Sequence, residues 1–158
     1  MKPAAGKRPR TVEIATDGVP VPRGSRRLSR FCARALETAG YSSWEVGILL
    51  CGDERITALN TRYRGKASAT DVLSFPAGEG VKDGPVRGDI AVSLPALSRN
   101  AAAYEVPENE EMKRLLVHGL LHLAGMDHGR GKSGKMLALQ EELLGKLRSE
   151  MIFGEKRK

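Results

Sequence analysis

Residues 107–128 read PENEEMKRLLVHGLLHLAGMDH and decide how the C-terminal half of the chain folds. Acidic residues follow the opening proline and apolar residues recur at helical spacing, so the stretch predicts a helix whose first turn is stabilised by the helix dipole. Gly125 predicts the end of this helix, because glycine reaches positive φ without steric cost. The same stretch holds all three histidines of the chain, His118, His122 and His128.

The spacing of these histidines predicts a metal site. His118 and His122 are four residues apart, so they lie one turn apart on the same helical face. The turn at Gly125 brings the chain back, and His128 can then join them around one ion. Three neutral ligands leave a coordination position for water, which is typical of a catalytic zinc site, so we expect one Zn²⁺ per chain. Asp127 either orients a ligand from the second shell or caps the turn.

The pattern H-x-x-x-H-x-x-G-x-x-H also has the spacing of a metzincin protease. Such a protease carries its general-base glutamate directly after the first histidine. This chain has Gly119 there. The missing carboxylate disfavours peptide hydrolysis.

The rest of the chain predicts a single α+β domain. Alternating or continuous apolar runs predict strands, and helical spacing predicts helices capped by Ser25 and Asp53. In the second helix we expect Tyr63 to point inward as a structural residue. The expected strands cover about 11–16, 44–51, 72–75 and 90–94, and the expected helices about 25–39, 53–64, 95–104, 107–124 and 135–149. Strands come first and helices last, which favours a mixed sheet of about four strands covered by helices, with the three-histidine motif in the C-terminal helical part.

Composition and charge limit the other functions. We interpret residues 1–10 as a disordered basic arm, 11–153 as the folded domain and 154–158 as a basic tail. The two ends contribute +6 of the net charge of +7, and the segment 22–66 has a local excess of +5. A local basic excess is compatible with nucleic-acid binding.

Localisation and cysteine state follow from what the sequence lacks. No apolar run approaches 18 residues and no apolar segment follows the basic N-terminus, so we expect no membrane span, no secretory signal and a cytoplasmic protein. Cys32 and Cys51 form no CxxC pair, and we expect them to be reduced, buried thiols.

Three blocks of the sequence resemble the YbeY family of bacterial endoribonucleases. The block 118–128, HGLLHLAGMDH, follows the family's HGxLHLxGxDH signature. The block 59–64, LNTRYR, is similar to its LNxxYR segment, and 70–76, TDVLSFP, followed by GDI at 88–90, is similar to its two strand motifs. The resemblance covers about 11–153.

The resemblance implies a zinc-dependent, single-strand-specific endoribonuclease that acts in ribosomal RNA maturation, at the small-subunit 3′ end, and in ribosome quality control. It maps His118, His122 and His128 onto the family's metal ligands and Arg64 onto its functionally important arginine. The implied partners are single-stranded RNA, ribosomal RNA, the small ribosomal subunit and a ribosomal protein or assembly GTPase.

The chemistry of the basic residues agrees with this. Phosphodiester cleavage builds negative charge on phosphate oxygens, which the guanidinium of Arg64 can bind in a bidentate manner. We expect Arg26, Arg27 and Arg30, on the polar face of helix 25–39, to hold the RNA backbone. The aromatic content of 4% argues against a platform that stacks bases.

Several points stay open at this level. The nucleophile is either the RNA 2′-hydroxyl or a metal-bound water, and no general base is assigned. Asp71 and Asp89 are expected to bond to backbone rather than to take part in catalysis. One rival interpretation is a non-catalytic ribosome-assembly factor that binds RNA and carries a structural metal, and another is a metal-dependent hydrolase of small molecules.

Overall fold

The computed structural model describes residues 8–20, 24–77, 84–126 and 133–153. The strands are β1 (Arg10–Asp17), β2 (Trp44–Cys51), β3 (Val72–Pro76) and β4 (Val86–Ser93). The helices are α1 (Ser25–Thr38), α2 (Asp53–Arg64), α3 (Leu94–Tyr104), α4 (Glu108–Leu123) and α5 (Ser133–Lys146). The expected α+β domain with a four-stranded sheet is therefore confirmed.

The sheet has the order β1-β2-β4-β3. The strands β1, β2 and β4 are parallel, and β3 runs antiparallel to β4. In this register Ile48 pairs with Ile14 on one side and with Ile90 on the other. The strands β1 and β3 form the two edges of the sheet, so each of them pairs with a strand on one side only.

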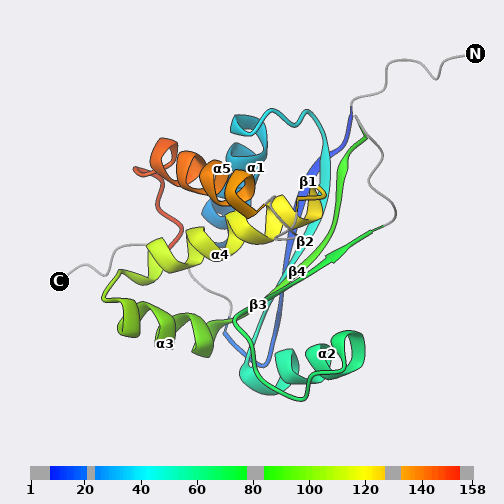
Figure 1. Cartoon of the computed structure of the whole chain (residues 1–158), viewed down its shortest axis with the longest axis vertical. Coiled ribbons are helices and arrows are strands. Elements are labelled where there is room, and N and C mark those ends of the chain that lie inside the picture. The colour runs from blue at the N-terminus through cyan, green and yellow to red at the C-terminus, as the bar shows by residue number, and fades with distance from the viewer. Residues whose placement is uncertain (1–7, 21–23, 78–83, 127–132, 154–158) are drawn as a thin grey trace, which may run out of the picture.

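The helices cover the two faces of the sheet unequally. Figure 1 shows α1, α4 and α5 on one face and α2 on the opposite face, near one end of the strands. The first face carries the main core, built from Trp44, Val46, Ile48, Leu50, Ile90 and Val92 of the sheet and the apolar sides of the helices. The second face has a small core of Cys51, Ile56, Leu73 and Ala91. Among the described helices, α2 covers only one end of the second face.

The helix α4 is the centre of the domain. It contacts β3 and β4 on one side and α1, α3 and α5 on its others. Gly119 allows the close approach to the sheet, because a Cβ at this position would meet three carbons of Ile90 at 2.9–3.2 Å. The helix ends before Gly125, which has φ 95° as predicted. Packing against Ile90 thus explains why glycine separates the two histidines.

Two predicted helix caps are wrong. The N-cap residues of α1 and α2 are Gly24 and Gly52, and neither helix has a side-chain cap. Ser25 and Asp53 are instead the first helical residues. The residue type alone does not fix the first helical residue to within one position, and Asp53, as the first residue of α2, still interacts favourably with the helix dipole.

The carboxylate of Asp53 joins three elements instead of capping its own helix. It accepts two hydrogen bonds from the Arg99 guanidinium, at 2.8 and 3.0 Å, and one from the Ser93 hydroxyl at 2.9 Å. The Arg99 hydrogen bond first, and then that of Ser93, hold the pKa of Asp53 below its usual value. Ser93 also accepts the amide of Ala96 and so caps α3. The contacts tie α2, β4 and α3 together.

Two further differences from the prediction are at the boundaries of elements. Strand β4 ends at Ser93, so Leu94, expected in the strand, begins α3. The last helix covers Ser133–Lys146 rather than 135–149.

Cys32 and Cys51 are buried free thiols, as expected. Within the described ranges, the helices are all too short or too polar to cross a bilayer.

Candidate active site

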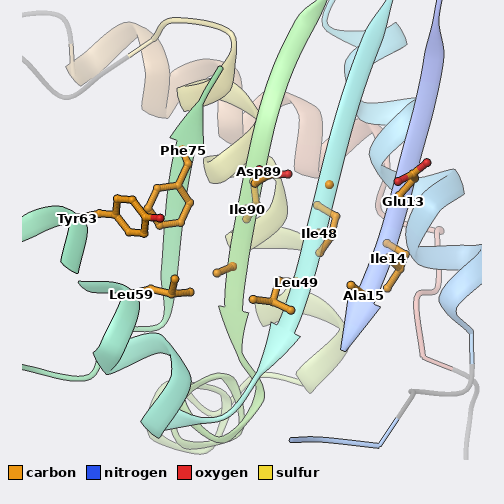
Figure 2. A pocket seen from close by; sticks show the side chains of 12 residues that line it. Glu13, Ile14, Ala15, Ile48, Leu49, Leu59, Tyr63, Phe75, Asp89 and Ile90 are labelled. Carbon is orange, nitrogen blue, oxygen red and sulfur yellow. The ribbon is translucent and has the colours of Figure 1, made fainter. Parts of the chain in front are cut away.

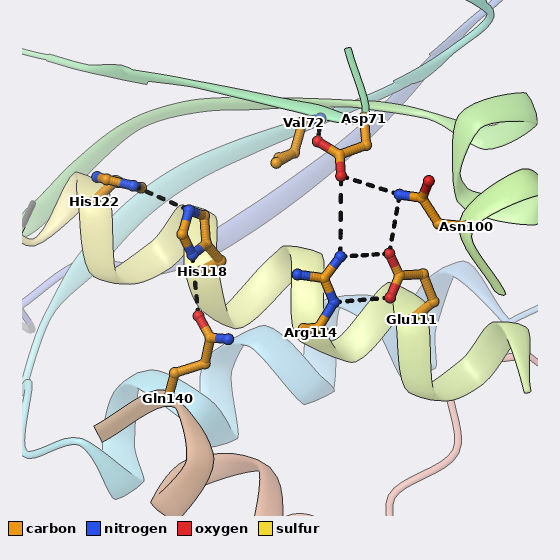
Figure 3. A network of polar contacts seen from close by, with 8 residues as sticks. All are labelled: Asp71, Val72, Asn100, Glu111, Arg114, His118, His122 and Gln140. Atoms are coloured by element: carbon orange, nitrogen blue, oxygen red, sulfur yellow. Dashed lines mark hydrogen bonds and ion pairs between the residues drawn. The ribbon is translucent and has the colours of Figure 1, made fainter. Parts of the chain in front are cut away.

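His118 and His122 face each other from consecutive turns of α4. Their Nε2 atoms are 3.1 Å apart, and both rings are half-buried. The two rings meet edge to face, with centroids 4.6 Å apart and an interplanar angle of 77°. The hydroxyl of Ser74 donates to the carbonyl of Gly119 at 3.5 Å, which places this pair beside the edge strand β3. The expected convergence of the two side chains is confirmed (Figure 3).

This geometry fits shared ligation of one ion. Two nitrogens 3.1 Å apart, each about 2.0–2.1 Å from a zinc ion, would subtend an angle of roughly 100° at the metal, close to the tetrahedral value. His128 and Asp127 lie outside the described residues. Among the residues that are described, no group of three His, Cys, Asp or Glu side chains forms a metal site. The three-histidine centre therefore stays a prediction.

Gln140 of α5 holds His118 from behind. Its Oε1 is 3.0 Å from His118 Nδ1, and the side chain is buried, with only 4% exposed. An amide oxygen accepts hydrogen bonds but does not donate them, so this contact is a hydrogen bond when His118 carries its ring proton on Nδ1. The lone pair of Nε2 is then directed toward His122. A second group that fixes the tautomer is common behind metal-binding histidines.

Gln140 was missed in the sequence, although a signal was present. Met136, Gln140, Leu143 and Leu147 are all buried and follow helical spacing along α5 and its end. A polar residue within such a buried stripe needs a partner, because an unpaired buried amide is costly. The partner lies 22 residues away on another helix, so the pattern could flag Gln140 but could not name His118.

A second polar network lies one to two turns before His118 on α4. Arg114 donates to both carboxylate oxygens of Glu111, at 2.8 and 2.6 Å, and its Nη2 is 3.9 Å from Asp71. Asn100 of α3 donates to both Asp71 and Glu111 at 3.1 Å. Glu111 is only 1% exposed, and its hydrogen bonds raise the pKa of Arg114. The network fixes α4 against α3 and the start of β3, and so holds the histidines in place (Figure 3).

The two aspartates of the strand motifs have different surroundings. Asp71 accepts the amide of Val72 at 2.8 Å, which confirms its expected backbone bond. Asp89 makes no backbone hydrogen bond among the described residues. Its carboxylate is exposed and lies over Gly47, where a Cβ would collide with Oδ1. The backbone prediction for Asp89 is wrong because its side chain crosses to the neighbouring strand.

The predicted RNA-binding arginines lie on different parts of the surface. Arg26, Arg27 and Arg30 are exposed on α1, which shares a sheet face with α4. Arg64 is exposed in the last turn of α2, on the opposite face. The edge strand β3 contacts both α4 and α2 and separates the two faces at this edge of the sheet. The structure thus does not gather Arg64 and the histidines into one cluster on one face.

The second face of the sheet is hollowed beside α2. We call this hollow, of about 490 Å³, the open-face groove; its walls include Leu49, Leu59, Tyr63, Phe75, Asp89 and Ala91 (Figure 2). Tyr63 was expected to point inward, but 58% of it is exposed. Its ring meets Phe75 edge to face, with centroids 5.2 Å apart. The expectation is wrong because α2 covers only one end of the sheet, so its last turn reaches beyond the small core.

Comparisons with known proteins agree with this architecture. Residues 16–148 match the family model described as endoribonuclease YbeY. The chain is 43% identical over 133 residues to the endoribonuclease YbeY of Treponema denticola, covering 80% of this chain and 86% of that protein. It is 44% identical over 136 residues to that of an Anaeromyxobacter species, covering 84% and 70%. A solution structure of a Thermotoga maritima protein superposes with a TM-score of 0.58 at 28% identity, over 88% of this chain and 93% of that one. The chain belongs to the endoribonuclease YbeY family.

Proposed function

We propose that this chain is a zinc-dependent endoribonuclease that cleaves single-stranded RNA during maturation of the small-subunit ribosomal RNA and in ribosome quality control. The observation that carries this is the histidine pair, with its Nε2 atoms 3.1 Å apart and with His118 fixed by a buried amide. Such an arrangement suits metal ligation, and membership of an endoribonuclease family makes RNA the substrate. The partners we propose are ribosomal RNA and the small ribosomal subunit in the cytoplasm, with a ribosomal protein or assembly GTPase.

The residues of the chain divide the work as follows. His118, His122 and His128 would hold the zinc, which supplies a Lewis acid for a phosphate oxygen or a water. Gln140 keeps the proton of His118 on Nδ1. Gly119 leaves no carboxylate between the first two histidines, so we assign no protein base, and the RNA 2′-hydroxyl remains available as nucleophile.

Arginine binds the RNA backbone in this proposal. Arg64 is exposed and charged, and a guanidinium can bind two phosphate oxygens at once. Arg26 and Arg30 follow one another by one turn on α1 and extend the basic surface on the other face. Phosphate contacts of this kind predict a steep loss of RNA binding with added salt, whereas hydrolysis of a neutral small molecule predicts little salt dependence.

The test uses the full chain with three substitutions. Metal content and cleavage of a single-stranded RNA are measured for the wild type, His118→Ala and Arg64→Glu. We expect one zinc per wild-type chain, loss of both metal and cleavage in His118→Ala, and retained metal with weak cleavage in Arg64→Glu. The matched control is Arg55→Glu, which reverses an exposed charge at the other end of the same helix.

Each outcome has one meaning. If His118→Ala cleaves RNA as well as the wild type, the metal-hydrolase proposal fails. If the wild type binds RNA and holds one zinc but does not cleave, the chain is a binding factor with a structural metal. If Arg64→Glu behaves like Arg55→Glu, Arg64 has no special role.

A further inference from the structure

Tyr63 is an exposed aromatic ring held in a fixed position. It is 58% exposed, yet Phe75 packs against it at an interplanar angle of 65°. The guanidinium of Arg62 lies 5.3 Å from the centroid of the same ring. A ring supported on one side and open on another loses little entropy when a flat ligand stacks on it.

The open-face groove beside this ring has the size and lining of a ligand site. Its volume of about 490 Å³ is within the range of small-molecule pockets. Near Tyr63 its walls are the apolar side chains of Leu59 and Phe75, which suit a flat, weakly polar ring. Figure 2 shows the carboxylates of Asp89 and Glu13 farther across the sheet. These two groups accept hydrogen bonds from amino groups and repel phosphate.

The charges around the groove fix the orientation of a nucleotide. Arg62, Arg64 and Lys66 are exposed around the C-terminal end of α2, next to Tyr63. Gly65, with φ 68°, ends the helix between two of them. A nucleotide would therefore place its base in the apolar part of the groove and its phosphate outward among these cations. An acidic ligand without an apolar ring would not fill the apolar part of the groove, and a purely apolar ligand would not pair with the cations at the end of α2.

The groove and the histidines lie back to back across one strand. Ser74 contacts Gly119 of α4 on one face of β3. Phe75, the next residue, contacts Tyr63 on the other face, because successive side chains of a strand alternate. Since β3 is the edge strand, an RNA strand can pass around it from one site to the other without crossing the sheet.

We infer that Tyr63 stacks an unpaired base of the RNA substrate while Arg64 binds a phosphate next to it. The inference rests on the proposed function, since it takes RNA as the ligand. A base within a duplex is already stacked on both sides and cannot enter the groove, so the contact selects single strands. The aromatic content of 4% does not argue against this contact, because a single tyrosine ring is enough to stack one base.

The experiment measures equilibrium binding of a fluorescently labelled single-stranded RNA at constant salt. Wild type, Tyr63→Phe, Tyr63→Leu and Tyr63→Ala are compared as full chains. Stacking on one aromatic side chain corresponds to about a 5- to 150-fold change in affinity, so we expect at least a fivefold loss in the leucine and alanine variants. Tyr63→Phe keeps the ring and should bind within twofold of the wild type.

The matched control is Tyr104, another exposed tyrosine with an arginine over its ring. It is 60% exposed, and Arg114 lies 5.8 Å from its centroid, but it is on α3, outside the groove. Tyr104→Ala should bind RNA like the wild type. Binding is also measured with an abasic strand of the same length, which keeps the phosphates and lacks the bases. The loss caused by Tyr63→Leu should vanish on that strand, whereas the loss caused by Arg64→Glu should remain.

The outcomes separate this inference from the proposed function. Normal RNA binding by a folded Tyr63→Leu or Tyr63→Ala variant, or an equal loss on the abasic strand, overturns the role of Tyr63 and leaves the nuclease proposal intact. A wild type that binds no single-stranded RNA overturns both. Thermal unfolding of each variant checks that α2 keeps its packing, and Tyr63→Leu preserves apolar bulk if Tyr63→Ala does not fold.

Discussion

Replacing Gln140 by leucine tests whether a residue on α5 prepares His118 for metal binding. Leucine keeps most of the buried volume and removes the acceptor that lies 3.0 Å from His118 Nδ1. The imidazole must then either leave a buried N–H without this partner or move its proton to Nε2. A buried N–H without a partner destabilises this position of the ring. A proton on Nε2 removes the lone pair with which His118 faces His122. Both lower the affinity for zinc.

The magnitude follows from the burial of the contact. A buried donor that loses its partner costs about 1–3 kcal/mol. Loss of a group that orients a metal-binding histidine typically lowers metal affinity by about 10- to 100-fold, which corresponds to about 1.4–2.7 kcal/mol. Gln140 is 4% exposed, so water does not easily take its place. We therefore expect a loss near the middle of this range, about 30-fold.

The assay is a zinc titration in competition with a chelator of known affinity. Nitrogen NMR of the metal-free protein gives a second measurement, the tautomer of His118, which should shift from Nδ1–H toward Nε2–H. Gln140→Glu keeps an acceptor and should retain zinc affinity, and Glu141→Leu is the control for an exposed position on the same helix. If Gln140→Leu binds zinc within twofold of the wild type and shows the same tautomer, Gln140 does not prepare His118 for metal binding.

Three further perturbations test the packing around the site. Burial raises the pKa of Cys32 to about 12 and is the largest cause that raises the pKa of Cys51 to about 11. Neither thiol should therefore react with a disulfide reagent at pH 8 until the chain unfolds. Rapid reaction of the native protein would contradict this. The folded-state pKa of Asp53 is depressed below 3.8, so its contribution is present above that pH and is lost as the pH falls through the folded-state pKa. Asp53→Asn should therefore lose unfolding free energy less steeply than the wild type as the pH falls from about 5 to about 2, as measured by urea titrations. An unchanged dependence of unfolding free energy on pH would contradict this role of Asp53. Gly119→Ala inserts a methyl group 2.9 Å from Ile90 and should lower the unfolding free energy by about 1–3 kcal/mol in urea, with partial recovery when combined with Ile90→Val; full stability of the single variant would be inconsistent with the packing.

Local patterns in the chain predicted most of the secondary structure. The apolar run around Ile48 is a buried strand, and the leucines of α4 form its inward side. The spacing of His118 and His122 placed both rings on one face of the helix, as the 3.1 Å contact confirms. Each of these features depends on residues within two turns or a few strand positions of each other, so periodicity alone is sufficient.

Contacts between elements could not be predicted in the same way. Asp53 suits a helix cap by its position, but its partners Ser93 and Arg99 come from elements that follow it by about 40 residues. Tyr63 has core spacing, yet it is exposed because α2 extends beyond the small core. Neither result is visible without the order of the strands and the position of α2 on the sheet.

Residue order alone was enough to predict the two-histidine face of α4, the glycine that ends this helix and the family to which the chain is similar. Packing between distant elements places Gln140 behind His118, makes glycine necessary at 119 beside Ile90, and puts Arg64 across the edge strand from the histidines. The two kinds of feature differ because the interactions behind them act over different distances along the chain. Backbone sterics and helical periodicity act over a few residues, whereas the neighbours of a buried side chain are chosen by strand order, register and the packing of whole helices.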